Sequence, residues 1–175
     1  MNKKDTKLIY GLILLVAASR LVPHPWNVAP IGALGLFSGA YLSKRIAWFI
    51  PVAALLLGDM IFGFYNPVVM IFVYCGFALS ALIGRVLLYQ RRSVHRVGIS
   101  VLIGAITFFL VSNFGEWFAF YPHTLDGLWL CYLNGLPYLG RSFIGDAVYS
   151  ALLFGGFEAI RYCVAKQAST RVIEK

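Results

Sequence analysis

The chain has 175 residues, of which 60% are hydrophobic and 13% are charged. Soluble domains carry about 25% charged residues. This composition, with a mean hydropathy of +0.78, excludes an ordinary soluble domain and indicates an integral membrane protein. The basic residues that give the net charge of +8 lie mostly between the apolar runs, so we do not interpret this charge as a sign of nucleic-acid binding. The length allows a single transmembrane domain over residues 1–175, with no linker or low-complexity tract to divide it.

The apolar runs predict an all-α, polytopic membrane protein with six transmembrane helices. A span needs about 20 apolar residues, with a range of about 17–25. The first run looks superficially like a signal peptide, but it ends in SRLVPHPW rather than in a small-residue cleavage site, so we retain it as a helix. The predicted spans cover residues 8–21, 28–42, 46–64, 67–89, 97–118 and 142–165.

The segment between the last two predicted spans is too short to cross a bilayer. Residues 125–136 are flanked by the turn-prone sequences YPHTLDG and NGLP. We therefore predict a short re-entrant or surface helix on the outer side, which would form a lid that opens when a ligand passes.

Small residues recur at four-residue spacing in the second predicted span. They are Ala29 and Ala33, followed by Gly35 and Gly39. Such spacing lets two helix backbones approach closely. Ordinary packing within the molecule is the interpretation that we favour.

The basic residues assign an orientation to the six predicted spans. With the N-terminus in the cytoplasm, 13 of the 15 Lys and Arg residues fall on the cytoplasmic side, as the positive-inside rule expects for short loops. Only Arg20 and Arg141 fall on the outer side. Both termini are then cytoplasmic, and we predict a multi-pass protein of the bacterial inner membrane.

Polar and charged residues gather toward the outer side in this topology. Asp59 lies about 20 Å into the third span at 1.5 Å per residue. Asn113 and Glu116 are at the outer end of the fifth span, and Asp146 is near the start of the sixth. Charged side chains inside a bilayer are costly and by default mark a functional site. The alternative is structural, in which Asp59 pairs with an arginine and locks the helices together.

Aromatic residues surround this cluster and have two interpretations. They would form an outer interfacial belt, or they would line a pocket in which a few polar groups hold a small molecule. Under the second interpretation, the candidate ligand-binding residues are His24, Asp59, Tyr74, Asn113, Glu116, Trp117, His123, Arg141 and Asp146.

The cysteines stand at positions 75, 131 and 163, and this spacing matches neither a metal motif nor a disulfide framework. Cys75 lies about 12 Å into the fourth span, roughly level with Asp59. A thiol at this depth could act as a soft metal ligand. The alternative is a small buried residue that behaves as an apolar one.

Catalytic motifs are largely absent. The sequence contains no nucleophile elbow, no HExxH motif and no P-loop. We therefore do not expect an enzyme, and we expect no cofactor.

Three stretches carry a resemblance to known proteins. They are SRLVPHPWNVAPIGALGLFSGAY, PVAALLLGDMIFGFYNP and SNFGEWFAFYPHTLDGLWLCYLNGLPYLGRSFIGDAVYSALLFGGFE. The chain resembles an uncharacterised family of small six-helix bacterial inner-membrane proteins. That family is similar to the substrate-binding S-components of energy-coupling-factor vitamin transporters, and in plan it is most similar to the solitary cobalamin-specific type.

The resemblance implies six helices, cytoplasmic termini and a vitamin-binding site that opens to the outer side beneath a loop lid. In the cobalamin type a cysteine coordinates cobalt, and Cys75 matches it in depth. Pocket-lining residues are then expected at His24, Asp59, Tyr74 and Arg141. S-components that dock to a shared energising module usually carry small residues at four-residue spacing in helix 1. The first span here lacks an Ala-xxx-Ala, so docking to such a module stays open.

Two functions from different classes follow from these patterns. The first is a transport component that binds a vitamin-like small molecule, with cobalamin as one candidate, from the outer side. The second is a membrane anchor or assembly factor that docks a periplasmic partner and transports no ligand. Membrane lipid surrounds the chain in both, and the missing motifs disfavour a third function, that of a membrane enzyme.

Overall fold

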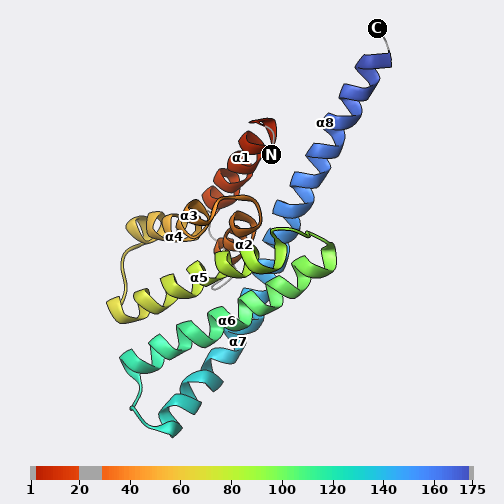
Figure 1. The fold of residues 1–175 in the computed structure, drawn as a ribbon. Helices are drawn as coiled ribbons and strands as arrows, with labels where there is room; N and C mark the ends of the chain where they lie inside the picture. Colours follow the sequence, from red (N-terminus) through yellow and green to blue (C-terminus); the bar gives the residue numbers. More distant parts are fainter. Residues whose placement is uncertain (1–2, 20–28, 174–175) are drawn as a thin grey trace.

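A computed structural model describes residues 3–19 and 29–173, and all of the regular elements in these ranges are helical (Figure 1). The all-α prediction is therefore confirmed. The elements are α1 (Lys3–Ser19), α2 (Ile31–Tyr41), α3 (Lys44–Ala47), α4 (Phe49–Phe62), α5 (Pro67–Leu88), α6 (Val94–Phe120), α7 (Leu125–Ser150), the π-helical turn η1 (Ala151–Gly155) and α8 (Gly156–Ile173).

Four helical segments of the described chain are long and apolar enough to cross a membrane, as expected for a membrane protein. They are Lys44–Phe62, Pro67–Leu88, Val94–Phe120 and Leu125–Lys166. The first two predicted spans fall short of this length, because α1 has 17 residues and α2 has 11. The helix count of the sequence prediction is thus supported only in part, with four candidate spans among the described residues.

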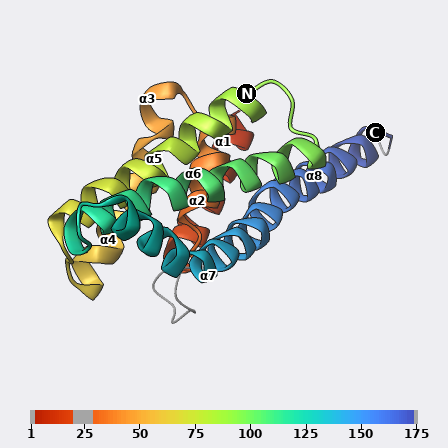
Figure 2. The same ribbon diagram turned by 90° about the horizontal axis from the view of Figure 1, so that it is seen from below.

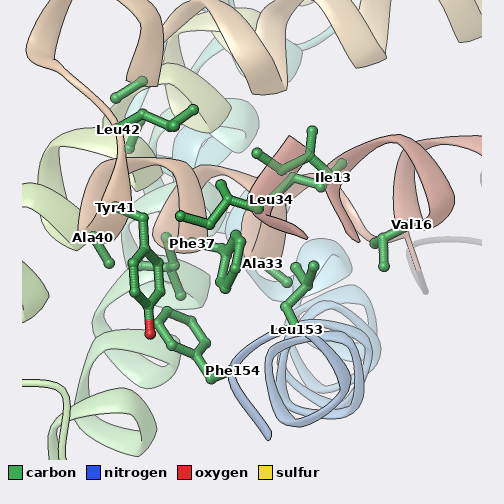
Figure 3. Packing of buried hydrophobic residues seen from close by; sticks show 14 of the residues in the cluster. Ile13, Val16, Ala33, Leu34, Phe37, Ala40, Tyr41, Leu42, Leu153 and Phe154 are labelled. Atoms are coloured by element: carbon green, nitrogen blue, oxygen red, sulfur yellow. The ribbon is translucent and has the colours of Figure 1, made fainter. Parts of the chain in front are cut away.

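Helix α2 forms the centre of the core. All 11 of its residues are buried, as expected of a helix that is apolar on every side. Phe37 packs edge-on against Phe154 at the η1 turn, with ring centroids 5.1 Å apart, and Ile13 of α1 belongs to the same cluster (Figure 3). A short helix is stable here because neighbours on all sides remove its apolar surface from the surroundings.

Glycines bring α2 and α5 into backbone contact. A Cβ atom on Gly39 would overlap the backbone of Ala81, and a Cβ atom on Gly84 would overlap the backbone of Leu36. Gly35 lies equally close to Ser80. The prediction that small residues at four-residue spacing pack within the molecule is therefore confirmed for these glycines.

Helices α5, α6 and α7 run antiparallel through short connections (Figure 1). Each begins at a side-chain cap, in which Asn66 accepts from Val68 N, Ser93 from Arg96 N and Thr124 from Gly127 N. Helix α4 ends at Gly63, whose φ of 102° lies in the left-handed region that favours glycine.

Basic residues gather where α5 connects to α6, and we call this part of the molecule the basic end. Arg85 donates to Leu42 O at 3.1 Å and Arg92 donates to Ala40 O at 2.8 Å, so both arginines hold the C-terminal end of α2. The basic end comprises Lys44, Arg45, Arg85, Arg91, Arg92 and Arg96. The α4–α5 and α6–α7 connections lie on the other side of the molecule (Figure 1).

The predicted lid is wrong, because residues 125–136 belong to one continuous helix. Helix α7 begins at Leu125, contains Pro137 and passes through η1 directly into α8 (Figure 2). A proline inside a helix removes a backbone donor and usually breaks the helix. Packing along α6 outweighs that local signal here, because Tyr132 donates to Leu110 O at 2.7 Å just before the NGLP sequence.

Candidate functional site

A cavity of about 440 Å³ lies between α5, α6 and α7, and we call it the three-helix cavity. It lies toward the α4–α5 and α6–α7 connections rather than toward the basic end, since its residues come from the start of α5, the second half of α6 and the first half of α7. Its lining residues are Val69, Val73, Phe108, Ser112, Asn113, Glu116, Tyr121, Cys131, Asn134, Gly135 and Tyr138.

Helical spacing places the polar groups of the three-helix cavity on facing surfaces. Asn113 and Glu116 are three residues apart in α6, and Asn134 and Tyr138 are four residues apart in α7. Residues three or four apart share one face of a helix. Two helices thus contribute amide, carboxyl and phenol groups to a single concave surface.

Asn113 is held in place by the packing of α6 on α7. Its Nδ2 donates to Phe109 O at 2.8 Å, and the Sγ of Cys131 donates to Asn113 O at 3.4 Å. A Cβ atom on Gly135 would overlap the Asn113 side chain, so glycine is needed for this close approach. The amide is therefore a fixed feature of the cavity wall.

The α7 side of the three-helix cavity is also hydrogen-bonded. Asn134 Nδ2 donates to the hydroxyl of Tyr121 at 3.3 Å, which joins the end of α6 to α7. The Arg141 guanidinium lies 5.7 Å from the Tyr138 ring centroid, so an exposed positive charge stands next to one wall residue.

Glu116 is half-buried and, unlike the side chains of Asn113, Asn134 and Tyr121, makes no hydrogen bond or ion pair with any described side chain. A carboxyl group within a membrane-spanning helix is costly and normally pairs with another polar group or faces a water-filled cavity. Glu116 follows the second pattern. It is the group in this wall with the most capacity left to bind a ligand.

The turn between α6 and α7 is fixed by its own side chains. Trp117 Nε1 donates to Pro122 O at 2.9 Å. A ring nitrogen of His123 lies 3.1 Å from Phe118 O, and the His123 ring stacks on Phe118 with centroids 5.1 Å apart. Trp117 and His123 therefore stand beside the three-helix cavity without lining it.

Two predicted acids have structural partners elsewhere in the fold. Asp146 is 5% exposed, and its Oδ1 accepts from Ala33 N at 3.0 Å, which satisfies a free donor at the start of α2. Asp59 is buried and its Oδ2 accepts from the Tyr74 hydroxyl at 2.9 Å, which joins α4 to α5. Asp59, Tyr74 and Asp146 do not line the three-helix cavity.

The predicted metal ligand also stands apart. Cys75 is exposed and does not line the three-helix cavity. Within residues 3–19 and 29–173, no group of three or more His, Cys, Asp and Glu side chains is arranged to hold a metal ion. His24 lies outside the described residues.

The structure thus brings together two of the predicted residues, Asn113 and Glu116. It adds Ser112, Cys131 and Asn134, which the sequence prediction did not include. The α7 residues were missed because their segment was interpreted as a short lid bounded by a turn. The period 131, 134, 138 was the available signal, since it marks one face of a continuous helix.

The chain belongs to a family of unknown function (DUF6580), whose model matches residues 1–169. A comparison with curated proteins and a comparison with solved structures found no match. Membership of this family assigns no activity, so the three-helix cavity is the main guide to function.

Proposed function

We propose that the protein is a membrane transport component that binds a small molecule in the three-helix cavity. The observation that carries this proposal is Glu116, a carboxyl group that faces a cavity and has no partner among the described side chains. Pockets for small molecules combine an apolar lining with a few placed polar groups. The apolar groups here are Val69, Val73 and Phe108.

The chemistry of the wall suggests the class of ligand. A carboxylate attracts a positive charge or a hydrogen-bond donor, and Tyr121 and Tyr138 offer ring faces that favour a cation. Asn113 and Asn134 supply neutral donors and acceptors. A ligand with an amine or another cationic group attached to an apolar or aromatic body would match this set.

The size of the cavity favours a ligand smaller than cobalamin. Its volume of about 440 Å³ is at the lower end of the range of about 300–1,000 Å³ for small-molecule sites. The cysteine matched to a cobalt ligand, Cys75, is exposed and outside the cavity. We therefore retain the vitamin-like ligand of the sequence hypothesis and do not propose cobalamin.

The direction of access follows from the basic end. The α5–α6 connection, which contains Arg91 and Arg92, lies on the other side of the molecule from the α4–α5 and α6–α7 connections (Figure 1), and the cavity residues lie toward the latter two. If the basic end faces the cytoplasm, as the positive-inside rule predicts, the three-helix cavity opens to the outer side of the inner membrane. The α2 glycines are in contact with α5, which favours a component that needs no energising module docked on that helix.

The test is a thermal-shift screen of the purified protein in detergent with water-soluble vitamins and small organic amines. At least one compound is expected to raise the Tm and to bind saturably in calorimetry. Glu116→Gln is expected to weaken that binding by about 10–100-fold, the loss of one charge-assisted hydrogen bond, while the Tm without ligand changes little.

Glu158→Gln is the matched control, because Glu158 is a second glutamate on an apolar helix and does not line the three-helix cavity. This variant should bind the compound as tightly as the wild type. If no compound binds, or if both variants bind equally well, the proposal fails.

A second candidate function is supported by the outer surface of α7. Leu125 and Trp129 are 83% and 68% exposed and line a groove of about 580 Å³. Such a surface would suit the periplasmic partner of an assembly factor. Site-specific crosslinking from Trp129 in intact cells would distinguish the two, because an assembly factor should yield a discrete protein adduct and a solitary carrier should not.

A further inference from the structure

A second concave surface lies beside the basic end, between the first half of α6 and the α7–η1–α8 helix. We call it the basic-end groove. It has a volume of about 460 Å³ and is lined mainly by apolar side chains, among them Val97, Val101 and Phe154. Both of its walls belong to segments that are apolar enough to span a membrane. The groove is therefore an apolar surface depression in which an acyl chain could lie.

Arg92 stands at one end of the basic-end groove and carries an uncompensated charge. Its Nη2 donates to Ala40 O at 2.8 Å and to Tyr89 O at 2.9 Å, and its guanidinium lies 4.2 Å from the Tyr41 ring centroid. All of these partners are neutral, and no described carboxylate pairs with Arg92. The Nη1 and Nε groups are left to bind an anion, with the fork geometry that suits phosphate.

One acid lies at the same end, and its charge is offset in part by Arg161, which also lies 3.9 Å from Asp5. Glu158 Oε1 lies 3.6 Å from Arg161 Nη1 and accepts weakly from the Tyr41 hydroxyl at 3.4 Å. Three further arginines of the basic end stand within eight positions of Arg92 along the chain, namely Arg85, Arg91 and Arg96. The potential at this end of the groove is therefore positive.

The deeper wall of the groove contains an unsatisfied polar atom. Ser150 is 1% exposed, it lines the groove, and its Oγ finds no hydrogen-bond partner among the described residues. Leaving such a group unpaired costs about 1–3 kcal/mol. The π-helical turn η1 begins at the next residue, and single π-turns inside α-helices frequently mark functional sites. The Oγ is covered by neighbouring atoms, and a small shift of this wall would let an ester carbonyl of a lipid accept from the hydroxyl.

We propose that the basic-end groove binds an anionic phospholipid, with the phosphate at Arg92 and an acyl chain between α6 and η1. Two observations from different chemistry support the same occupant: the Arg92 guanidinium, which has no carboxylate partner, at one end and the unpaired hydroxyl in an apolar wall. Arginines next to a membrane-spanning helix typically attract anionic lipids. This site is separate from the three-helix cavity and does not depend on the function of that cavity.

The test is native mass spectrometry of the purified protein with dioleoyl-phosphatidylglycerol, and with dioleoyl-phosphatidylcholine as the lipid of equal chain length without net charge. The anionic lipid is expected to bind at one saturable site and more tightly than the zwitterionic one. Arg92→Ala should lower its affinity about tenfold or more, because it removes a charge-assisted hydrogen bond to the phosphate. Arg91→Ala is the matched control, because Arg91 is a neighbour that does not line the groove.

Gly98→Leu is a second test that leaves Arg92 in place and fills the groove. It keeps the proposal testable if the Arg92 variant does not fold. A Cβ atom at Gly98 meets no atom within 4 Å, so a side chain there enters the open groove and should abolish the bound lipid. Equal binding of the two lipids would overturn the proposal. An equal loss of affinity in the Arg91 and Arg92 variants would also overturn it. A change from dimer to monomer in Gly98→Leu without any loss of lipid would overturn it too, and would assign the groove to a second copy of the chain.

Discussion

The surroundings of α2 and the three-helix cavity use the same kinds of residue for opposite purposes. Around α2, glycines lack side chains and so let two helix backbones touch, and the Asp146 carboxyl group accepts a hydrogen bond from Ala33 N. In the cavity, Gly135 also permits a close approach, but Glu116 is left without a partner. An embedded acid is therefore informative only once its partners are known.

The comparison separates the scaffold of the molecule from its candidate site. Substitutions around α2 should change stability and leave ligand affinity alone, because Ser38, Tyr41 and Asp146 all have hydrogen-bond partners. Substitutions in the cavity wall should do the reverse. The following variants test this division, from the largest expected loss of stability to the smallest.

Gly84→Ala should be the most destabilising, because the added methyl group would overlap the backbone of Leu36. Overpacking of this kind costs about 1–3 kcal/mol and occasionally more. Thermal unfolding in detergent should show a Tm lower by several degrees. In Gly140→Ala the new methyl meets no atom within 4 Å, and alanine is the better helix former. Equal losses in both variants would contradict backbone contact at Gly84.

Asp146→Ala should destabilise the protein by about 1–3 kcal/mol, because it leaves the Ala33 amide buried without its acceptor. Asp146→Asn retains an acceptor oxygen and should recover much of this loss in the same unfolding assay. A stability of Asp146→Asn as low as that of Asp146→Ala would mean that the negative charge, rather than the hydrogen bond, stabilises the start of α2.

Tyr74→Phe should cost about 1 kcal/mol, since it removes the hydroxyl that donates to Asp59 Oδ2 at 2.9 Å. The control is Tyr162→Phe, which changes a side chain that is 70% exposed and should leave the Tm unaltered. A loss of ligand affinity in Tyr74→Phe greater than its loss of stability would extend the candidate site to the Asp59–Tyr74 pair and thus to α4.

Asn134→Ala should have the smallest effect on stability, because it removes one long hydrogen bond of 3.3 Å to Tyr121. Calorimetry with a compound from the screen should nevertheless show weaker binding, since Asn134 lines the three-helix cavity. If the Tm falls as far as in Tyr74→Phe while affinity is unchanged, the cavity wall is part of the scaffold.

The long spans were predictable because their signals are local. Pro67 at a helix start, a continuous apolar run and arginines at its end mark α5 without any knowledge of its neighbours. The burial of α2 was not predictable, because a helix that is apolar on all sides gives no period. The 11 residues of the described helix fall short of the length of a span. The continuity of α7 was missed because NGLP favours a turn locally, whereas its packing on α6 is tertiary.

Only part of the candidate site could be predicted from the sequence, because local patterns mark polar residues but do not show their partners. Asn113 and Glu116 stand out as polar residues in an apolar run, so the sequence alone marks them. The partner of Asp146 lies 113 positions away along the chain, and no local pattern reports such a contact. Sequence reasoning therefore marks the groups that are costly to embed, but it cannot tell those that are hydrogen-bonded from those that are free.

The unbroken path from α7 into α8 has a mechanical consequence. Its stretch Leu125–Lys166 of 42 residues is about 63 Å long at 1.5 Å per residue, twice the hydrocarbon core of about 30 Å. The same rod therefore forms a wall of the cavity and extends beyond the bundle (Figure 1). A tilt of about 10° at η1 would swing the tip of the 18-residue α8 by about 5 Å. The π-turn lies between the two arms of this rod, so a shift of α7 beside the cavity would be transmitted to the tip of α8.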